Sequence, residues 1–166
     1  MDSTLQEILG GSIGFSQGIV GGNRMKTAEY KLQVSKFIKA KREKVFEAWI
    51  QPEIMKKWGC PKELKIGEIQ MDFRVGGKFR TSMLGNEDVY IATGIYQEII
   101  LNEKLVFTHG WEGPQREETL VTVIFEDKNG GTEIILTHEK LSSESSMEGH
   151  KEGWISTLEN LELQFT

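Results

Sequence analysis

The chain has almost no cysteine: Cys60 is the single one among its 166 residues. An intramolecular disulfide is therefore excluded, and a reducing compartment such as the cytoplasm is expected. A chain of this length has the size of one ordinary domain and can bury a sizeable core without a covalent link. We therefore expect packing and hydrogen bonds to hold the fold together.

Basic charge and long apolar runs are also scarce. Lysine and arginine number 20 against 25 aspartates and glutamates, which gives a formal net charge of −5. No basic stripe stands out, and this argues against nucleic acid as a main partner. No run of 18 apolar residues occurs, so no transmembrane helix is expected. Small molecules and other proteins remain as the partners to consider.

Residues 1–24 differ in composition from the rest of the chain. Six glycines fall between Gly10 and Gly22, and no hydrophobic period is sustained there. We interpret residues 1–24 as a flexible extension and residues 25–166 as the folded domain. The extension is an expression scar, a mobile arm, or a translated ribosome-binding site that precedes a natural start at Met25.

The last stretch, residues 145–165, predicts one long amphipathic helix. Five apolar residues recur there at helical spacing and share one face: Met147, Trp154, Leu158, Leu161 and Phe165. Ser145, with Glu148 three residues later, has the pattern of a capping box and predicts the start of the helix. An apolar face that contains a tryptophan and a phenylalanine requires a large partner surface, which we expect to be a sheet.

Most of the remaining chain predicts strands. After a first strand from Tyr30, two short helices are expected at residues 41–50 and 52–58. Six further strands follow: residues 63–75, 78–84, 89–100, 104–111, 118–126 and 132–140. Gly76-Gly77 and Asn129-Gly130-Gly131 have the composition of tight hairpin turns. Because strands and helices do not alternate, the sequence predicts an antiparallel sheet and the α+β class.

Several local patterns resemble one known family. Ordered along the chain, they are Phe37-Ile38-Lys39-Ala40, Val45–Trp49, Pro52-Glu53 to Trp58, Asp72–Gly77, Gly94-Ile95-Tyr96, Glu103–Phe107, Thr132–His138, His150, Gly153-Trp154 and Leu158. In this order they resemble the START-like (SRPBCC) superfamily, in the branch named for the activator of heat-shock-protein-90 ATPase. The resemblance implies a helix-grip (Bet v-like) fold, in which a curved antiparallel sheet of about seven strands wraps around the long helix and leaves a cavity.

The alternation along the strands and the face of the long helix indicate which residues would line this cavity. Apolar contact is expected from Phe79, Met83, Phe107, Trp111, Leu136 and Trp154, and orienting polar groups from Tyr90, His109, His138 and His150.

Three histidines raise the alternative of a zinc site with an open position. No closely spaced histidine pair of the H-x-x-x-H type occurs, so we expect no metal and no cofactor. The favoured interpretation makes His138 and His150 polar members of a mixed cavity wall, or a hydrogen-bonded pair that ties strand to helix. Cys60 is expected to be an inert thiol. Asp72 and Arg74 are expected to form a structural ion pair rather than a ligand-binding pair.

The sequence favours a non-catalytic binding module that holds a small hydrophobic or amphipathic molecule between sheet and helix. One alternative is a co-chaperone-like domain that stimulates a heat-shock-protein ATPase, with a chaperone protein as partner. Another is a cyclase or hydrolase acting on an aromatic or polyketide-like substrate, although no base and orienting group are evident and no catalytic residue is assigned. The protein is expected to be a monomer or a homodimer.

Overall fold

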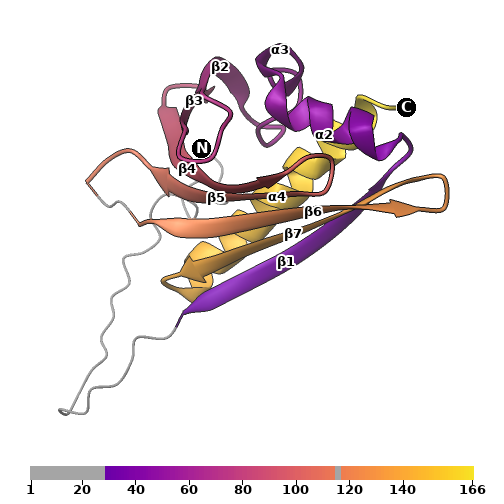
Figure 1. Ribbon diagram of the computed structural model, residues 1–166. Helices are drawn as coiled ribbons and strands as arrows, with labels where there is room; N and C mark the ends of the chain where they lie inside the picture. Colours follow the sequence, from indigo (N-terminus) through magenta and orange to yellow (C-terminus); the bar gives the residue numbers. More distant parts are fainter. Residues whose placement is uncertain (1–28, 115–116) are drawn as a thin grey trace, which may run out of the picture.

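The computed structural model describes residues 29–114 and 117–166, so the predictions about residues 1–24 lie outside the described residues. Seven strands form one antiparallel sheet in the order β1-β7-β6-β5-β4-β3-β2. Their bounds are β1 Tyr30–Ile38, β2 Lys65–Met71, β3 Lys78–Leu84, β4 Val89–Ile100, β5 Lys104–Trp111, β6 Thr119–Lys128 and β7 Gly131–Leu141. Helix α4 (Glu144–Leu163) crosses one face of this sheet (Figure 1). The predicted α+β, helix-grip fold class is confirmed.

The turn between β6 and β7 shows how the sequence sets the register of the sheet. Asn129 and Gly130 have φ angles of 49° and 80°, a left-handed pair that suits a two-residue hairpin. Lys128 consequently pairs with Gly131, and every later pair of β6 and β7 follows from that register. This register turns Ile134, Leu136 and His138 to the buried face, as the alternation predicts.

The prediction of a two-residue hairpin at Gly76-Gly77 is wrong. Strand β2 ends at Met71, and residues 72–77 form a longer connection that folds back on β4. The Gly76 N–H donates to the Tyr96 carbonyl at 2.8 Å, and the Gly77 N–H donates to the Arg74 carbonyl at 2.8 Å. A side chain at Gly77 would collide with the backbone carbonyl of Asp72, so this glycine permits close packing of the connection.

The start of α4 lies two residues before the predicted cap. Ser143 is the N-cap, with φ −150° and ψ 161°, and its hydroxyl accepts a hydrogen bond from the Ser146 N–H. Ser145 is exposed inside the first turn, so the predicted capping box with Glu148 does not form. The predicted apolar face does meet the core, because Leu158 and Leu161 are buried and the other three members pack against buried residues.

Two short helices, α2 (Arg42–Ile50) and α3 (Pro52–Met55), follow β1. Figure 1 shows them near the C-terminal end of α4, where β2 and β3 curve toward them. The second helix is shorter than predicted, because a series of turns begins after Met55. Trp49 and Trp58 are buried here with their rings 4.8 Å apart, edge to face. Among the described residues, no helix combines the length and hydropathy that crossing a membrane would require.

Candidate functional site

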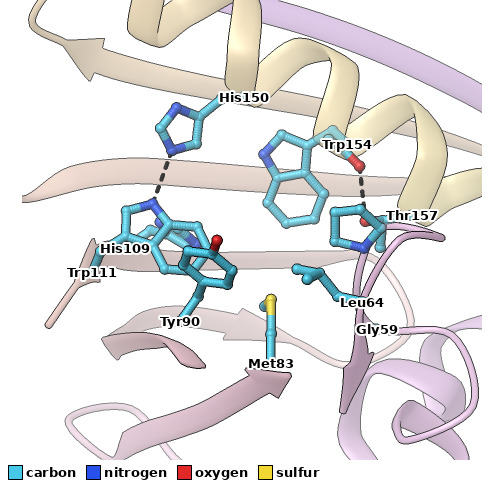
Figure 2. A pocket seen from close by; sticks show the side chains of 11 residues that line it. Gly59, Leu64, Met83, Tyr90, His109, Trp111, His150, Trp154 and Thr157 are labelled. Atoms are coloured by element: carbon cyan, nitrogen blue, oxygen red, sulfur yellow. Dashed lines mark hydrogen bonds between the residues drawn. The ribbon is translucent and has the colours of Figure 1, made fainter. Parts of the chain in front are cut away.

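Two small cavities lie side by side between the sheet and α4. The first, of about 60 Å³, is bounded by the ends of β3, β4 and β5, by α4 and by the loop after α3 (Figure 2). The second, of about 80 Å³, lies deeper, toward the two short helices. Both are lined by Gly59, Met83, His109, Trp154 and Thr157, so one wall separates them. Most of this wall is apolar, and His109 is its titratable member.

Eight of the ten predicted ligand-binding residues line one or both of these cavities. The first cavity is lined by Met83, Tyr90, His109, Trp111, His150 and Trp154. The second adds Phe79 and Phe107. Leu136 and His138 line neither cavity, because both are fully buried behind the wall.

Sequence reasoning missed several residues that line the cavities or support them. Leu64 and Thr157 line the first cavity, and Trp49 lines the second. Thr157 could have been found from its helical spacing, since it follows Gly153 by four residues and Trp154 by three. Thr119 could not have been found from its spacing in the sequence. It supports the site only through its hydrogen bond to His138 on the neighbouring strand.

His138 is held in one tautomer by its neighbours. The Thr119 hydroxyl donates to the His109 carbonyl oxygen at 2.8 Å. Its oxygen is therefore free to accept from Nε2 of His138, 2.7 Å away. On the other side of the ring, the Trp154 indole N–H donates to Nδ1 of His138 at 3.0 Å. The hydrogen-bond network thus places the proton of His138 on Nε2 and leaves its lone pair on Nδ1.

His150 is held in the opposite tautomer. Its Nδ1 lies 2.8 Å from the Ser146 carbonyl oxygen, which can only accept, so Nδ1 carries the proton. The Trp111 indole N–H donates to Nε2 of His150 at 3.2 Å, a bond that connects β5 to α4 (Figure 2). The predicted alternative of a hydrogen-bonded pair of His138 and His150 is wrong, because each histidine bonds to a tryptophan instead, and both of these bonds join a strand to α4.

His109 differs from the other two histidines. Its side chain is 7% exposed and lies against the rings of Trp111, His138, His150 and Trp154. Its ring nitrogens form no hydrogen bond within the part of the chain that the structure describes, yet they are not among the fully buried side-chain atoms left without a partner there, which are Arg42 Nε and Trp49 Nε1. Because His109 lines both cavities, a molecule bound in either could form a hydrogen bond with these nitrogens.

All three histidines are neutral near pH 7. Burial, aided by the charge of His150, lowers the pKa of His109 to about 3. Burial also holds the pKa of His138 well below its ordinary value, and the two neighbouring histidines act in the same direction. For His150, burial lowers the pKa while the hydrogen bond to Ser146 and the charge of Glu117 oppose the shift. The cavity wall therefore carries neutral imidazoles, which act as hydrogen-bonding groups without net charge.

Two other side-chain predictions can be placed. Cys60 is buried, and burial together with the charge of Glu63 raises its thiol pKa to about 11, which keeps it protonated and unreactive. The Asp72 and Arg74 side chains form an exposed ion pair at 2.9 Å, away from both cavities.

A larger groove of about 790 Å³ lies on the outer face of the sheet. Its wall includes Lys78, Arg80, Glu117 and Glu118, so it is polar and open. The Arg80 guanidinium is already engaged by the carboxylate of Glu112 at 2.7 Å. Phe79 alone of the predicted site residues borders this groove.

Comparisons with known proteins agree with this architecture. A family model described as Activator of Hsp90 ATPase homolog 1-like protein matches residues 39–165. A solved structure from Chromobacterium violaceum superposes with a TM-score of 0.75 at 20% identity, covering 81% of this chain and 96% of that one.

Two further solved structures are similar. One from Rhizobium leguminosarum has a TM-score of 0.72 at 27% identity, with 82% and 93% of the two chains covered. The AHSA1 protein from Silicibacter pomeroyi has a TM-score of 0.71 at 25% identity, with 81% and 96% covered. No curated protein matches the chain significantly.

Proposed function

Because this chain belongs to the Activator of Hsp90 ATPase homolog 1-like family, whose fold supports a binding module, we propose that it holds a small amphipathic molecule between the sheet and α4. The observation that carries the proposal is His109, a buried imidazole in the wall shared by both cavities, with no hydrogen-bond partner among the described residues. The ligand has an apolar body, which matches the apolar walls, and one polar group that bonds to this imidazole.

The cavity volumes constrain the size of the ligand. The two cavities measure about 60 and 80 Å³, whereas sites for drug-sized ligands span roughly 300–1,000 Å³. An apolar cavity of roughly 150 Å³ is known to accept benzene. Displacement of the shared wall would therefore admit a single substituted ring. A larger ligand would require the loop after α3 to move away from α4.

A matched pair of probes tests this proposal. Phenol and toluene have nearly the same shape, but only phenol can bond to the imidazole of His109. We expect titration calorimetry to show tighter binding of phenol by roughly three- to tenfold, the contribution of one net hydrogen bond. His109→Phe should abolish this preference while it retains toluene binding. Thr122→Val, on the outward face of β6, is the control and should leave both affinities unchanged.

Two results would overturn the proposal. In the first, neither probe binds. In the second, both bind equally to the wild-type protein and to His109→Phe, which would place them elsewhere. Native mass spectrometry on freshly purified protein then identifies the natural ligand class from any adduct that denaturation removes. A mass without adduct, together with no probe binding, would favour the protein-partner alternative that the family description suggests.

A further inference from the structure

The three histidines converge in space although they are distant in the sequence. His109 comes from β5, His138 from β7 and His150 from α4. One nitrogen of each ring lies within 4.8 Å of one nitrogen of each of the others, and all three side chains are buried. We propose that His109, His138 and His150 form a binding site for a divalent transition metal ion, with Zn²⁺ preferred and one coordination position open toward the first cavity.

The spacing of the rings suits a shared ion. Three imidazoles on one tetrahedral zinc, with nitrogen–metal distances of 2.0–2.1 Å, have ring centroids roughly 5 Å apart. The observed centroid separations are 5.2 Å for His109 and His138, 6.0 Å for His109 and His150, and 4.8 Å for His138 and His150. The rings would therefore need to turn toward one centre, with little movement of the strands or of α4.

The two hydrogen-bonded histidines also have the outer contacts that metal ligands require. A metal-bound histidine usually donates its second N–H to a backbone carbonyl, a carboxylate or another acceptor, which fixes the ring and its tautomer. Nδ1 of His150 donates to the Ser146 carbonyl, and Nε2 of His138 donates to the Thr119 hydroxyl. The lone pairs left for an ion are those on Nε2 of His150 and Nδ1 of His138.

Only neutral imidazole binds a metal, and the hydrogen bonds of His138 and His150 already leave one ring nitrogen of each without a proton. An all-histidine set with a fourth, open position is typical of zinc. That position would face the cavity lined by Tyr90 and Trp111, where a polar group of a ligand could reach the ion.

Two indole groups compete with the ion in this geometry. Trp111 and Trp154 donate their N–H groups to the same two lone pairs that a metal would need. Both side chains are only partly buried, which leaves them room to swing aside. The tryptophans therefore act as temporary caps on the site, and removal of one cap should strengthen metal binding.

The test uses the full chain without a polyhistidine tag, titrated with Co²⁺ and Zn²⁺. We expect one equivalent of Co²⁺ to give the strong visible absorption of a tetrahedral complex, and Zn²⁺ to displace it. His109→Gln should weaken metal binding by at least about 100-fold, because one of the three ligands is lost. Mutation of a residue that only hydrogen-bonds to a ligand typically weakens metal binding by about 10- to 100-fold. Trp111→Phe should instead tighten binding by roughly three- to tenfold, since one competing hydrogen bond is removed.

Thr122→Val is the control, because its side chain lies on the outward face of β6, opposite to the buried face that carries His138. It should leave the metal affinity unchanged. The proposal is overturned if neither the wild-type protein nor Trp111→Phe binds Co²⁺, or if binding survives His109→Gln unchanged. These readouts are independent of phenol and toluene binding, so failure here would leave the proposed ligand-binding function intact.

Discussion

At the scale of single residues, three histidines in one cluster occupy three different hydrogen-bonding environments. His138 and His150 each accept an indole N–H and donate to an oxygen, whereas His109 does neither. Their shared property is burial, which keeps them neutral. Protonation of any one would place a charge beside two other imidazoles in a site with little access to water.

We predict that the free energy of unfolding declines as the pH falls below about 6.5. In the unfolded chain His109 binds a proton near its ordinary pKa of 6.5, whereas in the folded protein its pKa is about 3. Between these values the unfolded state holds the additional proton, so acid favours unfolding, and above this window the contribution vanishes. Each such histidine costs up to about 1.4 kcal/mol per pH unit. Urea unfolding at pH 7.5, 6 and 5 measures the slope.

His109→Gln provides the control for this slope. The variant lacks one of the titrating groups, so its unfolding free energy should decline less between pH 6 and pH 5, by about 1 kcal/mol relative to wild type. Carboxylates contribute equally to both proteins and cancel in the difference. Parallel slopes for the two proteins would show that His109 is not buried in the neutral form.

Strand alternation was sufficient to predict that His109 and His138 face the core. His138 follows Ile134 and Leu136 at a spacing of two, and His109 follows Leu105 and Phe107 in the same way. The partners of these histidines could not be predicted, because Thr119, Trp111 and Trp154 meet them only through the order of the strands and the crossing of α4. The failure to predict the unpaired nitrogens of His109 has the same origin.

At the scale of elements, the predicted start of α4 was wrong because several neighbouring residues are equally able to cap a helix. Four serines lie between residues 142 and 146, and each could cap a helix. Strand β7 ends at Leu141, and the serine whose hydroxyl caps the helix is the earlier Ser143, which accepts from the Ser146 N–H. The strands between Lys78 and Trp111 matched the prediction because strong turn residues bound each of them.

Close packing between β3 and β4 leads to a prediction for Gly94. This glycine pairs with Phe79 across the two strands, and a side chain there would collide with the Phe79 ring and with the Thr108 carbonyl oxygen. The backbone oxygen cannot move aside without disturbing β5. Gly94→Ala should therefore lower the free energy of unfolding by at least about 2 kcal/mol, as overpacked cores do. Urea denaturation would measure the loss.

Gly85→Ala is the matched control for Gly94→Ala. Gly85 lies after β3, and a side chain there would meet its nearest neighbour, Leu64, at an ordinary contact distance of 3.4 Å. The change in unfolding free energy should stay below about 1 kcal/mol. Equal losses at the two glycines would mean that the close approach of β3, β4 and β5 is not the cause.

At the scale of the whole molecule, the loop after α3 forms part of the wall of the first cavity. We call residues 56–64 the strap; Gly59, Pro61 and Leu64 from this segment line the first cavity. The strap is attached to α4 by two backbone contacts: the Lys62 N–H donates to the Ser156 hydroxyl at 2.9 Å, and the Asn160 side chain donates to the Cys60 carbonyl at 2.9 Å. An ion pair between Lys62 and Glu159, at 2.6 Å, adds a third contact.

Detachment of the strap from α4 would open the cavity without disturbing the sheet, and Asn160→Ala tests this. The variant loses the hydrogen bond to the Cys60 carbonyl, at a cost of about 1 kcal/mol, so the strap should open more often while the strands stay closed. Hydrogen exchange followed by mass spectrometry should show faster exchange confined to residues 56–64, and phenol should associate faster.

Glu162→Gln is the control, because it breaks the ion pair of α4 with Lys36 on β1, remote from the strap. If exchange rises equally throughout the sheet in Asn160→Ala, or if Glu162→Gln opens the strap as well, the cavity is entered by global loosening of α4 rather than through the strap.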